Sequence, residues 1–302
     1  MNEITALNNQ YGIGAELIFE IGAGGQIIAT INNEQASASI ALQGAHLMTW
    51  QPAGSAPAIW LSPAARFAPG KSIRGGVPIC WPWFGAHSTE ADFPAHGFAR
   101  TTDWHVINSV SLSDGTTQIT FELTTADMPT RQWPQSTSVQ YQITIGKTLS
   151  LALITRNSGQ REITISEALH TYFAVSDVRN ITIGGLDGCH YLDKAASMRE
   201  KQQEGDVTFT SEVDRVYINT EADCVIRDPA LSRQIRISKT GGHSTVVWNP
   251  WIDKATQMGD MGEDGHLKMV CVESANAANN FVAIQPGNEH LLMVNYSIET
   301  IF

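Results

Sequence analysis

The sequence is poor in basic residues and in charge altogether. Its 302 residues hold 19 lysines and arginines against 30 aspartates and glutamates, which gives a formal net charge of −11, and only 16% of the residues are charged. A nucleic-acid-binding protein needs a basic face, and a polybasic membrane-binding segment needs clustered lysines and arginines. We therefore expect neither a nucleic acid nor a membrane as a partner.

Long apolar runs and paired cysteines are also missing. No stretch reaches the roughly 18 apolar residues that span a bilayer, and the chain does not open on the basic segment and apolar run of a signal peptide. The four cysteines, Cys80, Cys189, Cys224 and Cys271, lie far apart and form no CxxC pair. We expect them to be reduced thiols in or near the core of a cytoplasmic protein.

Several motifs of well-known chemistries are absent. The sequence has no GxSxG, no HExxH, no GxxxxGK(S/T) and no GxGxxG after a strand, and its nine histidines show no HxH or HxxxH spacing. These absences disfavour covalent nucleophilic catalysis, nucleotide binding and a catalytic metal. We expect no cofactor and no metal.

What the sequence does have is a period of two. Residues 118–123 and 139–145 alternate apolar and polar side chains, and after a turn at Gly146-Lys147 the alternation continues through Leu149, Leu151 and Leu153, which predicts a hairpin. Further strands are predicted at 26–31, 163–166, 181–183, 207–210, 234–238 and 292–298, and a helix only at 194–203. This density of strands indicates an antiparallel all-β sandwich or barrel. Because no repeat or linker is visible, we predict one domain over residues 1–302.

Residues 50–104 depart from this pattern. They contain seven of the twelve prolines, five of the eight tryptophans, and Arg66, Arg74 and Arg100. Proline stiffens the backbone and removes hydrogen-bond donors, so we expect an ordered loop, and ordered loops on a β scaffold often carry function. The tryptophans could cap one end of the core instead. The combination of tryptophan, arginine and histidine in one loop favours a ligand cleft.

Three ionisable residues lie in apolar or aromatic surroundings. His96 lies within FPAHGFAR, His170 follows a predicted strand within EALHTYF, and Glu273 ends a predicted strand at 268–273 with apolar neighbours on its own face. An apolar setting raises the pKa of a carboxyl group and suits it to acid–base chemistry near neutral pH. Each residue alone has a structural alternative, a hydrogen-bonded histidine or a solvated glutamate at the rim of a sheet.

Seven short motifs resemble, in their order, the aldose 1-epimerase superfamily. They lie at residues 72–78, 81–85, 96–100, 168–173, 212–217, 247–251 and 271–273, and the resemblance covers about residues 40–295. Within the superfamily the sequence is most similar to the hexose-6-phosphate mutarotase (glucose-6-phosphate 1-epimerase) branch, in its bacterial form.

This resemblance implies a galactose-mutarotase-like β-sandwich and an isomerase that interconverts the α and β anomers of hexose 6-phosphates, chiefly glucose 6-phosphate. By motif position, His170 matches the general acid and Glu273 the general base. Arg74, His96, Arg100 and Asp214 match substrate-binding positions. Ala95 stands where relatives can have glutamine, so one contact to the sugar differs here.

The chemistry agrees with these residue types. Anomer exchange by ring opening and reclosure needs one acid and one base and no redox change. The alternatives are a non-catalytic carbohydrate-binding protein, a mutarotase of free aldoses, and a glycoside hydrolase that would pair Asp214 with Glu273. Arg74 and Arg100 favour a phosphorylated sugar, because guanidinium groups bind phosphate oxygens well, although either could instead brace the loop. A sugar phosphate is thus the expected partner, and a monomer the favoured state.

Overall fold

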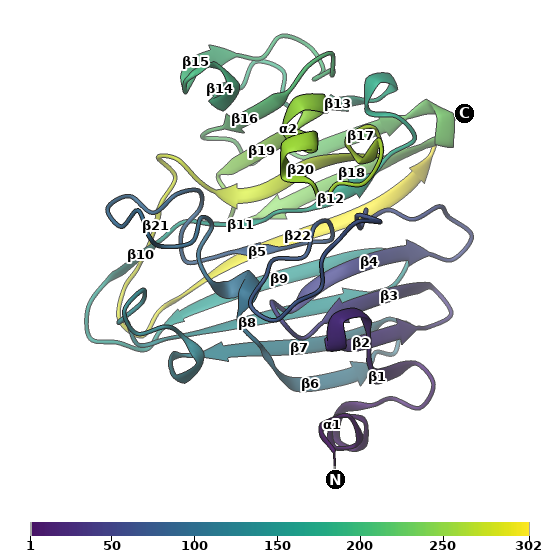
Figure 1. Cartoon of the computed structure of the whole chain (residues 1–302), viewed down its shortest axis with the longest axis vertical. Helices are drawn as coiled ribbons and strands as arrows, with labels where there is room; N and C mark the ends of the chain where they lie inside the picture. The colour runs from purple at the N-terminus through teal and green to yellow at the C-terminus, as the bar shows by residue number, and fades with distance from the viewer. Residues whose placement is uncertain (1, 302) are drawn as a thin grey trace.

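Alternating burial along the chain shapes the longest strands. The computed structural model describes residues 2–301, and in β8 (Thr137–Ile145) every second side chain is buried. The turn at Gly146-Lys147 leads into β9 (Thr148–Asn157), with Ile145 opposite Leu149. The predicted hairpin is confirmed, and it lies in the middle of a large sheet (Figure 1).

That sheet has eight antiparallel strands. Their spatial order is β13 (Thr182–Gly184), β17 (Cys224–Asp228), β18 (Arg233–Thr240), β22 (Glu289–Thr300), β9, β8, β7 (Thr117–Thr124) and β6 (His105–Ser111). The C-terminal strand β22 thus joins the N-terminal and C-terminal halves of the sheet, because it pairs with β9 on one side and with β18 on the other.

The second large sheet also has eight strands. Its order is β15 (Arg199–Gln202), β14 (His190–Asp193), β16 (Val213–Tyr217), β19 (Ser244–Asn249), β20 (Met269–Asn276), β11 (Glu167–Leu169) and β5 (Ile79–Cys80), with β12 (Tyr172–Ala174) also paired to β20. All eight residues of β20 are buried. This strand is therefore the centre of the sheet, and it carries Glu273.

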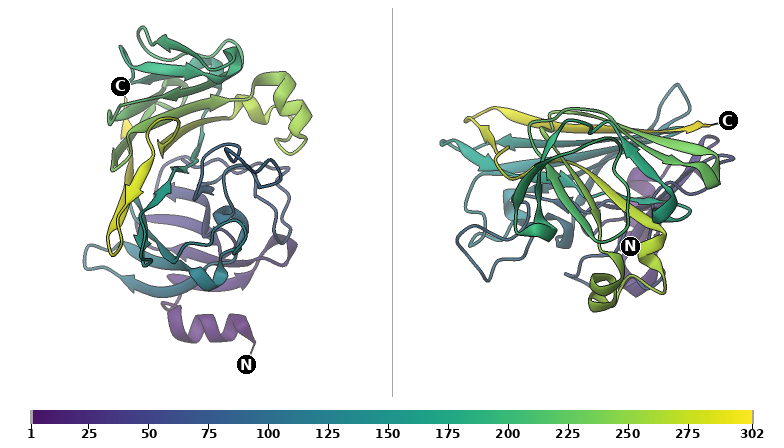
Figure 2. Two further views of the ribbon diagram at one scale, coloured as in Figure 1. Left: turned by 90° about the vertical axis from the view of Figure 1, so that its left-hand side faces the viewer. Right: turned by 90° about the horizontal axis from the view of Figure 1, so that it is seen from above.

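Two smaller sheets and two helices complete the fold. The smaller sheets comprise β1 (Leu17–Ile21), β2 (Ile27–Asn32), β3 (Ala36–Ala41) and β4 (His46–Pro52), and separately β10 (Ile163–Ile165) and β21 (Val282–Ile284). The helices are α1 (Glu3–Tyr11) and α2 (Trp251–Met258). Helix α1 lies at one end of the long axis and β14–β16 lie at the other (Figures 1 and 2). Within residues 2–301, neither helix has the length and apolar character needed to cross a membrane.

The core lies between the two large sheets. Val270 and Val272 of β20 belong to the same buried cluster as Tyr296 of β22, and the ring of Phe173 packs edge-on against Tyr296 with centroids 5.0 Å apart. Because side chains alternate along a strand, Glu273 faces away from this core. The antiparallel all-β sandwich predicted from the sequence is confirmed.

Several local predictions are wrong, and both α-helices, α1 and α2, lie outside the one stretch predicted to be helical. Residues 194–203 are not a helix, because only one turn forms, η5 (Lys194–Ala196), and the chain then passes through left-handed residues Ser197 and Met198 into strand β15. Pairing of β15 with β14 overrides the helix propensity of this polar stretch. The predicted strand at 207–210 is reduced to a single bridge between Val207 and Ile183.

The five tryptophans of residues 50–104 belong to the core. The exposed fraction of each is 8% or less. Four of the five indole N–H groups donate to partners inside the protein; Trp81, for example, donates to the Thr155 hydroxyl at 3.1 Å and Trp50 to the Gly146 carbonyl at 3.1 Å. The sequence allowed two interpretations of these tryptophans, a cap on one end of the core or part of a ligand cleft. For these five side chains the first interpretation holds, because they are buried in the protein.

Candidate active site

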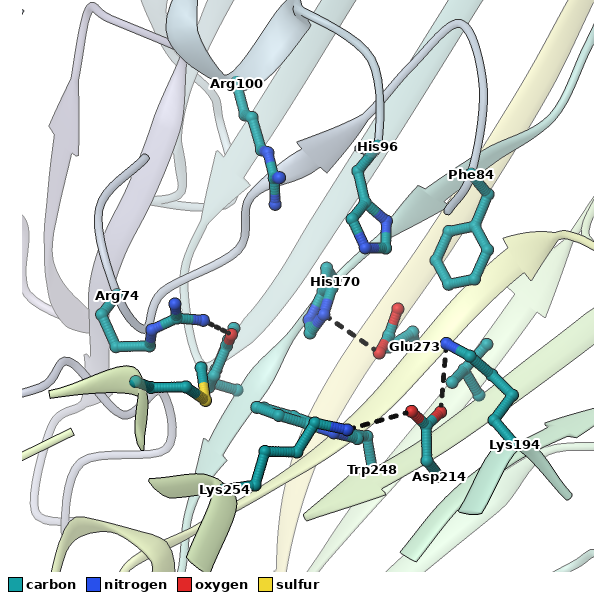
Figure 3. A pocket seen from close by; sticks show the side chains of 13 residues that line it. Arg74, Phe84, His96, Arg100, His170, Lys194, Asp214, Trp248, Lys254 and Glu273 are labelled. Atoms are coloured by element: carbon teal, nitrogen blue, oxygen red, sulfur yellow. Dashed lines mark hydrogen bonds and ion pairs between the residues drawn. The ribbon is translucent and has the colours of Figure 1, made fainter. Parts of the chain in front are cut away.

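One pocket brings together all six residues singled out in the sequence. It has a volume of about 330 Å³ and is lined by Arg74, His96, Arg100, His170, Asp214 and Glu273, together with residues that include Phe84, Lys194, Trp248 and Lys254 (Figure 3). This volume lies at the small end of the range for small-molecule sites. Residues nearly 200 positions apart in the chain meet here, because the pocket opens on the face of the second sheet that is turned away from the core.

Strand register places His170 beside Glu273. Strand β11 runs antiparallel to β20 with Leu169 opposite Ser274, so the next residue, His170, reaches the neighbourhood of Glu273. The two side chains face one another, with His170 Nε2 3.3 Å from Glu273 Oε1 (Figure 3). Glu273 does not end its strand as predicted, because β20 continues to Asn276 between β19 and β11. The carboxyl group is therefore held in the middle of the sheet.

Burial controls the protonation of this pair. Glu273 is 1% exposed, and burial, reinforced by the negative charge of Asp214, raises the pKa of its carboxyl group well above the usual value. Burial and the nearby positive charge of Arg100 hold the pKa of His170 well below its usual value. Both shifts favour the uncharged forms of the two side chains. The Nδ1 atom of His170 and the Oε2 atom of Glu273 have no hydrogen-bond partner among the described residues.

His96 is fixed as a hydrogen-bond donor. Its backbone has a φ of 68°, its N–H donates to the Gly85 carbonyl at 2.7 Å, and its Nδ1 lies 3.3 Å from the Gly85 N–H. Burial, with the positive charge of Arg100, lowers the pKa of the ring to about 3, so the imidazole is neutral. Because Nδ1 accepts from Gly85, the proton of the neutral ring must be on Nε2. His96 can thus donate to a ligand hydroxyl.

The two arginines are held differently. Arg74 Nε lies 3.0 Å from Asp260 Oδ1, and its Nη1 donates to the Tyr172 hydroxyl at 2.9 Å. Arg100 donates through Nη2 to the Ala95 carbonyl at 2.8 Å, and within residues 2–301 no carboxylate forms an ion pair with it. Arg74 is thus partly neutralised, whereas Arg100 keeps an unopposed charge for an anionic group.

Two lysines that the sequence motifs did not reveal surround Asp214. Lys194 Nζ lies 3.3 Å from one carboxylate oxygen and Lys254 Nζ 3.7 Å from the other (Figure 3). Lys254 also pairs with Glu212 at 2.6 Å. Burial is the main cause of a raised pKa for Asp214, which the two lysines oppose. Lys194 lies in the stretch that the sequence wrongly predicted as a helix, and Lys254 lies on α2, which the sequence did not predict.

Aromatic rings pack around the imidazole of His170. Tyr172 stacks on it with ring centroids 5.0 Å apart and an interplanar angle of 13°, and Trp248 meets it edge-on at 5.9 Å. Trp248 comes from β19, outside the tryptophan-rich loop. The sheet therefore supplies Tyr172 and Trp248 to the apolar wall of the pocket. The loop of residues 50–104 contributes Phe84 to this wall, and also Arg74, His96 and Arg100.

Two lining residues of the pocket form a group of potential metal ligands with a buried cysteine beside them. One ligand atom from each of His170, Cys271 and Glu273 lies within 4.8 Å of the others, the one such group found within residues 2–301. Cys271 and Glu273 are two residues apart on β20, so their side chains share one face of the sheet. His170 directly follows the end of β11. Motif spacing could not have found this group, because its members come from two separate segments.

Comparison with known proteins shows which family this chain is similar to. A sequence model of the aldose 1-epimerase family matches residues 27–297. A protein of Escherichia coli named "Putative glucose-6-phosphate 1-epimerase" is 38% identical over 87% of this chain and 88% of its own, and one of the same name from Salmonella typhimurium is 38% identical over 83% of each chain.

A solved structure agrees with these relatives. The crystal structure of YeaD from Salmonella typhimurium, described as a putative mutarotase, superimposes with a TM-score of 0.89 and 33% identity over 96% of both chains. The family model and the structural superposition both extend over nearly the whole sequence. The chain therefore belongs to the aldose 1-epimerase family and is an isomerase that interconverts sugar anomers.

Proposed function

We propose that this enzyme interconverts the α and β anomers of hexose 6-phosphates, chiefly glucose 6-phosphate. The observation that carries the proposal is the buried His170–Glu273 pair, 3.3 Å apart, in a pocket that also holds four cationic side chains. The names of the relatives point to the same substrate. An acid–base pair serves the anomeric centre, and the cations serve a phosphate dianion.

In this proposal Glu273 is the general base and His170 the general acid. The Glu273 carboxylate takes the proton of the sugar O1 hydroxyl while the His170 imidazolium protonates the ring oxygen O5. The C1–O5 bond then breaks, which leaves an aldehyde at C1 and a hydroxyl at C5. After rotation about C1–C2, His170 takes the O5 proton back, O5 attacks the other face of C1, and Glu273 returns its proton to O1.

The reactive form requires a charge on both residues of the pair. Ring opening starts from the Glu273 carboxylate and the His170 imidazolium, whereas burial favours the uncharged forms of both side chains. Because Nε2 of His170 and Oε1 of Glu273 are 3.3 Å apart, each charged group stabilises the other when both are charged.

The remaining side chains orient the substrate. Arg100 binds the phosphate, since it is the pocket cation without a carboxylate partner, and Arg74 adds a second, partly neutralised charge. His96 and Asp214 hydrogen-bond the sugar hydroxyls. Arg66, the third arginine of residues 50–104, is not among the residues that line the pocket and takes no part in phosphate binding.

Further features of the proposal concern the molecule's setting. The four cysteines are free thiols, which is the state expected in the reducing cytoplasm. We place the enzyme there as a monomer that needs neither cofactor nor metal. Light scattering of the purified protein checks the monomer directly.

The direct test follows the equilibration of freshly dissolved α-anomers by NMR. Purified enzyme should speed the equilibration of α-glucose 6-phosphate far more than that of α-glucose. A carbohydrate-binding protein without catalysis would accelerate neither sugar. A preference for free glucose would contradict the proposed substrate and leave the isomerase assignment intact.

A further inference from the structure

Two lining residues of the pocket and the buried Cys271 beside them have the composition of a site for a transition-metal cation. His170 supplies an imidazole nitrogen, Cys271 a sulfur and Glu273 a carboxylate oxygen, and the three atoms lie within 4.8 Å of one another. Nitrogen, sulfur and oxygen are the donors that Zn²⁺ takes in proteins, typically from three residues where a fourth position stays open. Hard cations such as Mg²⁺ avoid sulfur and prefer an all-oxygen shell.

The distances suit tetrahedral coordination. At bond lengths of about 2.0–2.1 Å to nitrogen and oxygen and about 2.3 Å to sulfur, tetrahedral ligands lie roughly 3.3–3.6 Å apart. His170 Nε2 and Glu273 Oε1 are already 3.3 Å apart. The ligand atoms of all three residues lie within 4.8 Å of one another, and coordination would draw the Cys271 sulfur closer to the other two.

The group also has unused bonding capacity. Glu273 is 1% exposed, yet the Oε2 atom of its carboxyl group has no hydrogen-bond partner among the described residues. A buried polar atom without a partner is rare, and an ion is one of its ordinary explanations. Cys271 is fully buried against Tyr172, Trp248 and Met269, so a cation would be shielded from water on that side.

Charge balance permits a buried cation here. A divalent cation displaces one proton from the Cys271 thiol and one from the Glu273 carboxyl group, and thiolate, carboxylate and cation together carry no net charge. Burial of a neutral group avoids the desolvation penalty of an unpaired ion. Of the four cations that line the pocket, Arg74, Lys194 and Lys254 are already paired with carboxylates, so their repulsion of a metal is reduced.

We infer that His170, Cys271 and Glu273 form an inhibitory site for a divalent transition-metal cation, with Zn²⁺ as its representative. The cation binds the two side chains to which we assign proton transfer, so it stops turnover and competes with the sugar. Cys271 has no role in the reaction, and its sulfur gives this site its selectivity for zinc over magnesium. The site stands on geometry alone, whereas its effect on turnover rests on the proposed function.

The binding test uses cobalt as a coloured substitute for zinc. Co²⁺ added to the chelator-treated protein should give a thiolate-to-cobalt charge-transfer absorption that Zn²⁺ abolishes. Cys271→Ala should lose this absorption, and Cys80→Ala, which removes an equally buried cysteine on β5, should keep it. Cys271→Ser, which keeps the side-chain size, provides a second variant should the alanine variant fold poorly. Absence of the absorption in the wild-type protein overturns the site.

The activity test separates inhibition from binding. Chelator-treated enzyme should be fully active, Zn²⁺ should reduce the rate at least tenfold and reversibly, and the same concentration of Mg²⁺ should have no effect. Cys271→Ala should keep the basal rate and need at least ten times more Zn²⁺ for half-inhibition, whereas Cys80→Ala should respond as the wild type does. Equal inhibition of both variants refutes a role for Cys271. Cobalt absorption without any anomerase activity would refute the proposed function and leave the metal site standing.

Discussion

At the scale of single residues, Arg74 and Arg100 should respond differently to removal. Arg100→Ala removes a charge that has no carboxylate partner, and loss of a charge-assisted bond to phosphate costs about 1.5–3 kcal/mol, roughly tenfold to a hundredfold in kcat/KM. We expect this loss for glucose 6-phosphate and little change for glucose. Arg74→Ala leaves Asp260 and Tyr172 without their partner, so it should lower the Tm and the activity on both sugars.

Steady-state kinetics on both sugars and a melting curve for each variant distinguish these outcomes. If Arg100→Ala leaves the preference for the phosphorylated sugar intact, the phosphate lies at Lys194 or Lys254 instead. In that case Lys194→Ala or Lys254→Ala should reduce the preference for glucose 6-phosphate over glucose.

The protonation of Glu273 predicts a pH-dependent stability. The ordinary pKa values are 4.5 for glutamate and 6.5 for histidine, and the folded pair holds one proton because the first value is raised and the second lowered. Between pH 4.5 and 6.5 the unfolded chain also holds one proton on these two residues. Above pH 6.5 it holds none, so the contribution of the pair to stability falls as the pH rises, by up to about 1.4 kcal/mol per pH unit.

Glu273→Gln removes this proton uptake. Its Tm relative to the wild type should therefore rise steadily as the pH increases from 5 to 9. Melting curves across this range provide the check, with the exposed variant Glu263→Gln as the control. A difference in Tm that does not change with pH would mean that the carboxyl group of Glu273 titrates normally.

Much of the pocket could be predicted from sequence, and the reason is local. His96, His170 and Glu273 each lie in a short segment with an unusual polar residue among apolar ones, so each motif is visible by itself. Lys194 and Lys254 have no such signal, because a lysine in a polar stretch is ordinary. Only the pairing of β14 with β16 and the position of α2 bring these lysines to Asp214.

At the scale of elements, α2 is held in place by one buried side chain. Asn249 is fully buried, and its Nδ2 donates to the carbonyls of His266 at 2.7 Å and Met269 at 2.9 Å, while its Oδ1 accepts from the Trp251 N–H at 2.9 Å. The helix in turn carries Lys254 and Met258 into the pocket. Asn249 thus connects the end of β19, the start of α2 and the start of β20.

Asn249→Ala should disturb this junction. It leaves buried backbone groups without partners, which should cost about 2–3 kcal/mol of stability, and the KM for the sugar phosphate should rise because Lys254 loses its position. Thermal unfolding and kinetics measure both effects. The exposed neighbour Gln257→Ala on the same helix should change neither. A normal KM in the Asn249 variant would show that α2 does not depend on this residue.

The sequence predicted strands better than helices for a physical reason. Alternation of apolar and polar residues marks the half-buried strands β7, β8 and β18 directly. Helix α2 is short, so its period is weak, and the surviving signals are Pro250 before it and Gly259, with φ of 67°, after it. Residues 194–203 contain good helix formers, but the strand edge of β14 supplies a tertiary partner that propensity cannot anticipate.

At the scale of the whole molecule, one core connects the N-terminal and C-terminal parts. A single buried cluster extends from Leu17 to Tyr296. The small sheet β1–β4 is tied to the central hairpin, since Asn33 donates to the Ile145 carbonyl at 3.0 Å and Trp50 donates to the Gly146 carbonyl at 3.1 Å. These contacts support the prediction of one domain over residues 1–302.

A single domain should unfold in one step. We expect one calorimetric transition in which the calorimetric and van't Hoff enthalpies agree. Two resolved transitions, or limited proteolysis that releases a stable fragment, would contradict the single domain. The position of the site would be unaffected, because its residues come from both halves of the chain.

The central claim is that His170 and Glu273 carry out proton transfer at the anomeric centre. It is tested most directly by the exchange rate between α- and β-glucose 6-phosphate, measured by NMR with the wild type, Glu273→Gln and His170→Ala at equal concentrations of folded protein. Each variant should lose a factor of about 10² or more in kcat, while its binding of the sugar phosphate, measured by calorimetry, stays within a few-fold of the wild type. A folded variant with near-normal turnover would contradict the role assigned to the residue it lacks.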